Sequence, residues 1–470
     1  MPFVLSGNVG SATAATGFNV DNSCMFNSAD SASMEKDAAA PTDNNKWTFS
    51  AWVKRSKLGT LQEIFYGEAN STNYCTIRFN DTSDTLTFKN RPGSTTSTLT
   101  TSAVFRDPNA WLHLVVVLDT SNGTAANRDI IYINGVRETN FSTESHSGDG
   151  DVCYINSDGD AMKISKGNSA SFFNGYMAEV YFIDGQALAA SDFGEFDEDS
   201  PTIWKPIDVS GLTFGTNGFY LDFEASGNLG NDANGGTDLT EVNLAATDQS
   251  TDTCTNNFAT LNSLIYITNA GMTLSEGNLK VVTSADAHRN AYGTMGVSSG
   301  KWYWEINIVD TTGDHQKIGV VNEDNAEINK TSPSEFSGDA NGYAYRTDGQ
   351  KENNDSASSY GNSYTDDDII GVAMDLDNNK LYFSKNGTFQ NSGDPTTGST
   401  GTGSAFNLAA NKTYFAAINQ YGGNTSSFNF GSPPYAVSSG NADGNGFGNF
   451  EYAPPSGYFA LCTKNLAEFG

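Results

Sequence analysis

The same short pattern, an apolar strand that runs into Asn-Gly, occurs twice in this sequence: DIIYING in residues 129–135 and KLYFSKNG in residues 380–387. Asn and Gly both tolerate φ > 0, which the type I′ turn of a tight hairpin requires at its two central positions. In both places an apolar strand and a polar loop come before the pattern. We interpret the two patterns as equivalent hairpins in two separate β-sandwiches.

The rest of the chain also reads as strands and turns. Short apolar runs alternate with clusters of Gly, Asn, Asp, Ser and Thr, and the sequence contains 48 Gly. In residues 46–56, KWTFSAWVKRS, the apolar side chains fall on every second position, which is the period of a strand with one buried face. No long stretch has helical periodicity. These features predict an all-β chain.

A chain of 470 residues is too long for one hydrophobic core. We expect two antiparallel β-sandwich domains of the jelly-roll kind, over residues 1–190 and 266–470. Residues 191–265 are rich in Gly and Asn but retain several large apolar side chains. We therefore expect them to form a structured connector that docks against one or both domains.

Composition and charge restrict the partners. The formal net charge of −30 disfavours nucleic acid and anionic membranes. No segment approaches the roughly 20 apolar residues that cross a bilayer, and residues 1–10 lack the features of a signal peptide. We expect a protein made in a cytoplasm and not inserted in a membrane.

The five cysteines are scattered through the chain without any C-x-x-C spacing. This pattern indicates neither a zinc site nor a disulfide framework. We expect them to be small buried hydrophobic residues.

Several motifs of the first half resemble laminin-G-like, concanavalin A-like jelly rolls. The matching segments are FSAWVK (49–54), WLH (111–113), IYING (131–135) and the closing strand FFNGYMAEVYFIDGQAL (172–188). The second half resembles the SPRY domain. Its matching segments are GKWYWE (300–305), IGV (318–320), the hairpin at 368–387 and NFG (429–431). Both resemblances imply β-sandwiches that bind through their loops.

The phrasing of residues 182–262, from FIDGQAL through WKP and GFYLDF to TNNFATLN, resembles a recurrent segment in structural proteins of tailed, often marine, bacteriophages. This resemblance implies a virion protein. We expect it on the virion surface, among other tail or capsid proteins, as a homo-oligomer.

Patterns for catalysis are weak. The Glu-x-Asp-x-x-Glu pattern of jelly-roll glycoside hydrolases is missing, although Glu179, Asp222 and Glu224 are carboxylates on expected strands. The four histidines have no nucleophile context, and we expect His113 to be buried and hydrogen-bonded. We expect a protein that is not an enzyme and requires no cofactor.

Calcium remains a hypothesis. The loops SGDGD (147–151) and NSDGDA (156–161) offer carboxylates that Ca²⁺ prefers, although Asp-Gly is also a common way to make a turn. The candidate ligands are Asp149, Asp151, Asp158 and Asp160.

Recognition by loops is the remaining route to function. Tyr and Asn in polar loops suit both sugar rings and protein epitopes, and each Tyr could equally cap its own sheet edge. The candidates are Tyr345, Tyr360, Tyr364, Asn419, Tyr421 and Asn424. We expect a tail fibre or receptor-binding component that adheres to a host surface glycan or protein. The alternative is a capsid decoration or accessory protein, and a polysaccharide-degrading enzyme is a distant third.

Overall fold

The computed structural model describes residues 4–5, 17–168, 171–266, 271–284, 286–312, 315–328, 330 and 334–470. Most of residues 1–10, on which the signal-peptide expectation rests, lie outside this set. The chain divides into two compact units, Ala15–Thr255 and Asn256–Gly470 together with Met1–Ala14. We call them the N-terminal unit and the C-terminal unit.

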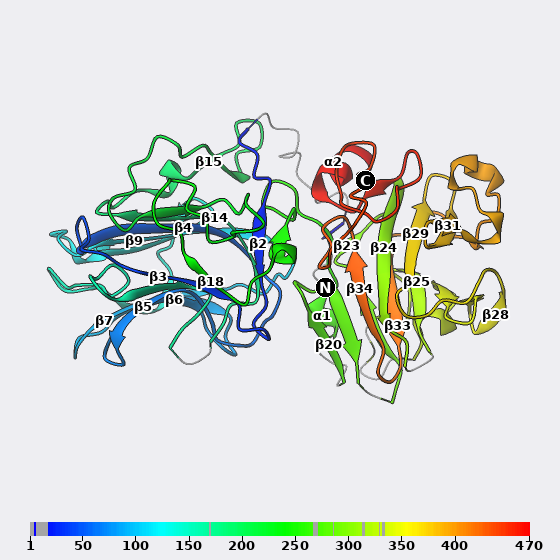
Figure 1. Cartoon of the computed structure of the whole chain (residues 1–470), viewed down its shortest axis with the longest axis horizontal. Helices are drawn as coiled ribbons and strands as arrows, with labels where there is room; N and C mark the ends of the chain where they lie inside the picture. The colour runs from blue at the N-terminus through cyan, green and yellow to red at the C-terminus, as the bar shows by residue number, and fades with distance from the viewer. Residues whose placement is uncertain are drawn as a thin grey trace. The chain divides into compact units, whose positions relative to one another are not determined.

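The N-terminal unit contains two eight-stranded sheets, seen as two layers in Figure 1. The first has the order β11 (Val136–Arg137), β10 (Asp129–Ile133), β9 (Trp111–Asp119), β4 (Lys46–Arg55), β14 (Gly175–Asp184), β2 (Ser23–Phe26) and β19 (Gln249–Ser250), with β17 (Phe219–Leu221) paired to β14. The second has the order β12 (Phe141–Ser145), β8 (Ser97–Val104), β7 (Thr85–Pro92), β6 (Asn73–Phe79), β5 (Gln62–Asn70), β13 (Ala161–Ile164), β3 (Ser33–Asp37) and β18 (Thr240–Val242). The short elements are η3 (Ala125–Asn127), η4 (Ala190–Asp192), η5 (Ala246–Asp248) and the hairpin β15 (Gly194–Phe196) with β16 (Trp204–Pro206).

The core of this unit lies between the two sheets. The expected alternation on β4 places Trp47, Phe49, Ala51 and Val53 in it, each at most 1% exposed. Phe49 stacks on Phe65 of β5 in the facing sheet, with ring centroids 4.8 Å apart. This packing confirms the predicted sandwich.

The other face of β4 is also buried, because a third layer covers it. Thr48 donates to the carbonyl of Gln186 at 2.9 Å, Ser50 lies in a buried group with Trp204, and Lys54 pairs with Asp252. The sequence alternation had suggested a polar outer face for β4. That face is instead an internal interface.

Part of the segment expected as a connector forms this third layer, in which Trp204, Val209 and Phe214 pack with Val115 and Val117 of β9. Residues 191–255 belong to the N-terminal unit, and β17, β18 and β19 add strands to its two sheets. The expected boundary at residue 190 therefore lies inside a compact unit. The physical reason is that the apolar side chains of this segment, such as Phe219 and Leu221, are buried in the first unit's own core.

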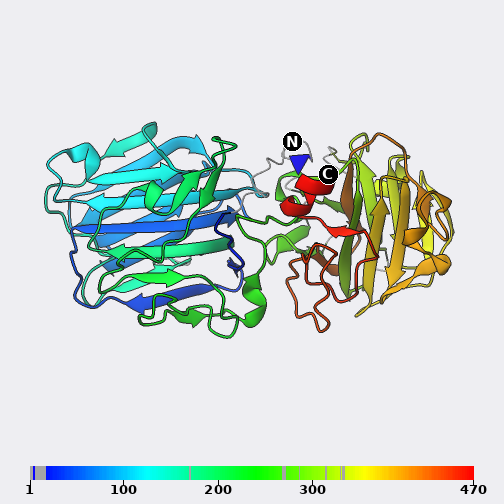
Figure 2. The same cartoon turned by 90° about the horizontal axis from the view of Figure 1, so that it is seen from above.

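The C-terminal unit is a second sandwich (Figure 2). Its nine-stranded sheet has the order β20 (Met272–Ser275), β21 (Lys280–Thr283), β34 (Thr425–Asn429), β24 (Lys301–Asp310), β29 (Ile369–Asp375), β30 (Lys380–Lys385) and β31 (Thr388–Phe389), with β32 (Phe406–Asn407) paired to β30 and β35 (Phe459–Ala460) paired to β24. Its six-stranded sheet has the order β22 (Arg289–Tyr292), β33 (Tyr414–Gln420), β25 (Lys317–Asn322), β26 (Gly342–Arg346), β27 (Gln350–Asn353) and β28 (Ser356–Ser359). The remaining elements are β1 (Val4–Leu5) paired with β23 (Met295–Gly296), α1 (Ser263–Tyr266), α2 (Thr463–Phe469), η6 (Phe336–Gly338), η7 (Gln390–Ser392) and η8 (Pro395–Thr400).

Strand β24 shows the same arrangement as β4. Trp302 and Trp304 point into the core, while Glu305 on the other face is covered by the chain near residue 450. The Glu305 carboxylate accepts the backbone N–H groups of Glu451 and Tyr452 at 2.9 and 2.8 Å. The C-terminal segment therefore covers the outer face of this sheet.

Both Asn-Gly pairs form the predicted turns. Ile133 pairs with Val136, and Lys385 pairs with Thr388, so each turn has two residues between the paired positions. All four turn residues have positive φ, from 47° to 79°. The all-β class and the two hairpins are confirmed. Within the described residues, no helix has the length and apolar character needed to cross a bilayer.

Candidate functional site

His113 on β9 lies in a buried group that resembles a catalytic serine–histidine dyad. Its hydrogen bond to the serine runs in the opposite direction, from the histidine to the hydroxyl. Its Nε2 is 2.8 Å from Ser50 Oγ, and its Nδ1 accepts the indole N–H of Trp204 at 2.9 Å. Burial lowers the pKa of His113 to about 3, so the ring is neutral. A neutral ring whose Nδ1 accepts carries its proton on Nε2 and donates to Ser50. It cannot take a proton from the serine, and the prediction of a buried, bonded histidine is confirmed.

Glu179 on β14 is engaged by its neighbours. Its carboxylate accepts the hydroxyl of Tyr181 and, at 3.0 Å, the hydroxyl of Tyr220. Burial raises its pKa to about 7, although these two hydrogen bonds lower it. Asp222 accepts the backbone N–H of Glu224, whose side chain is exposed. Glu179 is thus buried against two tyrosine hydroxyls, while Asp222 lies close enough to help raise its pKa.

Three of the tyrosines expected in binding loops are in the core of the C-terminal unit. Tyr345, Tyr360 and Tyr364 are at most 8% exposed. The rings of Tyr345 and Tyr360 pack on Phe383, and that of Tyr364 packs on Tyr345. The Tyr364 hydroxyl donates to the carbonyl of Gln316 at 3.1 Å. Their hydroxyls find partners inside the protein, which allows the rings to be buried. The structure thus places them as core residues and not as a ligand surface.

The second loop group is divided. Asn419 and Asn424 are buried, and Asn419 donates to Asn290 Oδ1 at 2.7 Å. Tyr421 is half-buried, with its ring 5.1 Å from that of His288 and 5.7 Å from that of His315. Of the six loop candidates, Tyr421 is the one that retains surface and gathers other aromatic rings.

The aspartates proposed for calcium lie in two turns. Gly150 and Gly159 have positive φ, as Asp-Gly turns require, and Asp151 accepts the backbone N–H of Gly148 at 2.7 Å. Asp149 and Asp158 are exposed. Among the described residues, the three-ligand grouping suited to a cation does not include these four aspartates. Calcium binding stays a prediction based on loop composition.

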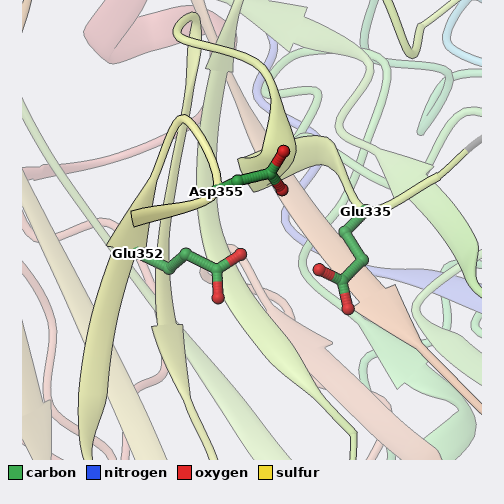
Figure 3. Close-up of side chains that lie close together, drawn as sticks. All are labelled: Glu335, Glu352 and Asp355. Atoms are coloured by element: carbon green, nitrogen blue, oxygen red, sulfur yellow. The ribbon is translucent and has the colours of Figure 1, made fainter. Parts of the chain in front are cut away.

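That grouping consists of Glu335, Glu352 and Asp355 in the C-terminal unit, and Figure 3 shows the carboxylates of Glu335 and Glu352 facing each other. Two of its three carboxylates are already paired with the protein's own cations. Lys317 Nζ contacts Glu335 and lies 2.6 Å from Glu352 Oε1, and Arg346 binds the other oxygen of Glu352 at 2.6 Å.

Burial raises the pKa of Glu352, but hydrogen bonds from Lys317, Ser337 and Arg346 outweigh it and leave the pKa below its ordinary value. The ionised Glu352 carboxylate is therefore already paired with Lys317 and Arg346. The cluster is therefore a charge network that joins β25, β26 and β27, and a metal ion would have to displace Lys317 from it.

A pocket of about 260 Å³, lined by both charged and apolar side chains, lies in the N-terminal unit at the end strands of both sheets, β11 and β12; we call it the edge pocket. It is lined by Ala126, Asp129, Ile130, Arg137, Glu138, Thr139, Phe141, Glu144 and His146.

The charged side chains of the edge pocket use only some of their polar atoms in hydrogen bonds and ion pairs with the rest of the protein. Asp129 is buried and accepts the N–H and hydroxyl of Ser147, and burial raises its pKa. His146 Nε2 is 3.2 Å from Glu144, and Arg137 donates to the carbonyl of Ala126 at 2.5 Å. The guanidinium has five N–H donors in total, so several can reach a ligand. Sequence reasoning missed this site because its residues come from separate strands and loops.

A second pocket of about 180 Å³ lies beside Trp111 and has mostly apolar walls. Its two arginines, Arg55 and Arg106, both bind Asp84, at 3.0 and 2.9 Å. The polar groups of this pocket are therefore less available than those of the edge pocket.

Two family models match the chain. Residues 27–192 match the concanavalin A-like lectin/glucanases superfamily, and residues 301–433 match the SPRY domain. No curated protein sequence matches the chain.

Solved structures also resemble it. The SPRY domain of human HERC1 is 18% identical, with 32% of this chain and 87% of that chain covered and a TM-score of 0.26. Stonustoxin is 19% identical, with coverage of 36% and 27% and a TM-score of 0.28. A human SPRY domain is 15% identical, with coverage of 36% and 98% and a TM-score of 0.26. The chain therefore carries a laminin-G-like, concanavalin A-like domain followed by a SPRY domain.

Proposed function

We propose that this protein is a non-enzymatic adhesin of a tailed-phage virion surface and that its N-terminal unit binds a glycan of the host cell. The observation that carries the binding role is the edge pocket, which combines charged and apolar side chains at the rim of a concanavalin A-like sandwich. The virion setting is supported by the phage-like phrasing of residues 182–262. Other virion proteins and further copies of this chain would be its structural partners.

The lining of the edge pocket suits a saccharide. Carboxylates accept hydrogen bonds from sugar hydroxyls, the Arg137 guanidinium donates to them, and Ile130 and Phe141 offer apolar area to a ring. Its volume of about 260 Å³ is below the roughly 300 Å³ at which typical small-molecule pockets begin, so it fits one sugar ring.

The charges of the pocket restrict the kind of sugar. Asp129, Glu138 and Glu144 outnumber Arg137, the one permanently charged cation of the lining. Like charges brought together without solvent are unfavourable. The ligand class is therefore a neutral or amino sugar, in preference to a uronic or sialic acid.

The polar groups that might have suggested catalysis are engaged in hydrogen bonds within the fold, which favours binding over catalysis. The proton of His113 lies on the nitrogen that faces Ser50, and Glu179 is held by two tyrosine hydroxyls. Each of these groups is used within the fold.

A glycan array tests the proposal with fluorescently labelled full-length protein. We expect the wild type to bind neutral or amino sugars, and Arg137→Ala to weaken binding about 10- to 100-fold, because hydrogen bonds to a charged group contribute about 1.5–3 kcal/mol. Lys57→Ala is the matched control, since it removes an exposed positive charge of the same unit outside the pocket. No bound glycan for a folded wild type refutes glycan adhesion. Equal binding by Arg137→Ala refutes the edge pocket.

The virion setting has its own test. Electron cryomicroscopy of particles, with antibody labelling of this chain, should place it at the tail. Label on the head would replace adhesion with capsid decoration, and unlabelled particles would refute the virion role.

A further inference from the structure

Two of the five cysteines, which the sequence leaves far apart, meet inside the N-terminal unit. Cys75 on β6 and Cys153 are both fully buried. Both are free thiols in the structure, and the nearby Cys153 thiol adds to burial in raising the pKa of the Cys75 thiol. The expectation of small buried cysteines holds for both residues, but the sequence did not indicate that these two would meet.

The neighbouring strands show why the pair meets. In the sheet, Cys75 is flanked in register by Gly67 of β5 and Asn90 of β7. On one side, the Asn90 amide donates to the carbonyl of Val152 at 3.2 Å. On the other side, a Cβ placed on Gly67 would lie 2.5 Å from the Cα of Ile155. The backbone from 152 to 155 thus crosses directly over β6, and Cys153 is held above Cys75 from both sides.

The segment that carries Cys153 is a cover without regular strands. It runs from the end of β12 to the start of β13, and its tip, residues 148–150, is exposed. Segments of this kind open locally at lower free energy than core strands. Opening of the cover would give a small reagent access to both sulfurs.

We propose that Cys75 and Cys153 are a redox pair that forms an intramolecular disulfide with a low-molecular-weight disulfide, such as oxidised glutathione, as oxidant. One cysteine thiolate attacks the glutathione disulfide, which forms a mixed disulfide and releases one glutathione thiolate. The second cysteine thiolate then attacks the protein sulfur of the mixed disulfide and releases the second glutathione thiolate. Two electrons pass to glutathione, the two cysteine protons end on the two glutathione thiols, and one protein disulfide forms.

The disulfide would link the acidic cover, including the Asp149–Asp151 turn, covalently to the centre of the sheet. It closes a long loop between residues 75 and 153, so it restricts the unfolded chain and stabilises the unit. In the native state the reaction is slow at neutral pH, because burial raises the pKa of the Cys75 thiol well above its ordinary value. The reaction therefore proceeds through the opened cover, where the thiols are solvated. Its rate should rise about tenfold per pH unit below the ordinary thiol pKa of about 8.5, because the thiolate is the nucleophile.

Disulfide mapping of the native full-length protein tests the proposal. One sample is incubated with oxidised glutathione at pH 9 and another with dithiothreitol. Both are then alkylated, digested without reduction and analysed by mass spectrometry. We expect the oxidised protein to be lighter by two hydrogen atoms when its intact mass is measured before alkylation. It should also yield a peptide linked through Cys75 and Cys153 and melt several degrees higher than the reduced protein.

Variants of single cysteines complete the test. Cys75→Ser and Cys153→Ser should each abolish the linked peptide and the rise in melting temperature, while Cys24→Ser, another buried cysteine outside the pair, should keep both. Recovery of the two cysteines as free or glutathionylated residues from wild-type protein overturns the proposal. So does a linked peptide that joins a different pair.

Discussion

The buried ion pair between Lys54 and Asp252 offers the sharpest test of the third layer in the N-terminal unit. The Lys54 Nζ is 2.6 Å from Asp252 Oδ2, and the two side chains are 0% and 1% exposed. The other carboxylate oxygen of Asp252 accepts the indole N–H of Trp111 at 3.0 Å. One carboxylate from residues 249–255 thus anchors two side chains of the sheet below.

Asp252→Ala should destabilise this unit by about 3–5 kcal/mol, the usual cost of removing one partner from a buried ion pair. The variant leaves the Lys54 ammonium buried without that carboxylate. Replacing both partners, as in Lys54→Met with Asp252→Leu, should recover most of the loss, because it removes the buried charges altogether. Lys166→Ala breaks an ion pair whose side chains are 31% and 36% exposed, and it should cost at most about 1 kcal/mol.

Hydrogen–deuterium exchange across a urea series measures these values unit by unit. Peptides from β4 report the N-terminal unit, and peptides from β24 report the C-terminal unit in the same sample as an internal reference. We expect the β4 peptides to lose protection at lower urea in Asp252→Ala, with the β24 peptides unchanged. A loss below about 1 kcal/mol would show that residues 249–255 are not part of the cooperative unit.

Two further predictions concern stability. Folding raises the pKa of Glu179 from 4.5 to about 7, so between these pH values the carboxyl group is ionised in the unfolded state but still protonated in the folded state. The free energy of unfolding therefore keeps its full value below pH 4.5 and falls as the pH rises to 7. Above that pH the loss levels off at roughly 3 kcal/mol. Glu179→Gln should flatten this part of a urea-denaturation pH profile for the N-terminal unit, and an unchanged slope would contradict the assignment. Gly387 has φ of 76°, and an added Cβ would lie 2.4 Å from the Tyr452 ring. Gly387→Ala should therefore cost the C-terminal unit at least about 1–2 kcal/mol in the same exchange assay. Gly444→Ala, which meets no atom closer than 3.8 Å, should cost much less, and equal losses would refute the steric argument.

The candidate site shows where sequence reasoning stops. Tyr345, Tyr360 and Tyr364 stand among polar residues, which suggested a surface, yet each hydroxyl finds a partner inside the core. Asp129 and Arg137 carry no motif that marks them as neighbours in a pocket. Their meeting depends on how the end strands of two sheets lie together, which no local pattern records.

The sequence by itself determined the all-β class, the two hairpins and the two family resemblances, because strand alternation and Asn-Gly turns are encoded within a few residues of the chain. Tertiary structure alone decided that the supposed connector is a third layer, that Cys153 crosses Cys75, and which charged groups are buried. These features depend on contacts between distant positions, such as Lys54 and Asp252, which are 198 residues apart. Such contacts depend on complementary packing and desolvation across layers, and those exist only once the sheets have formed.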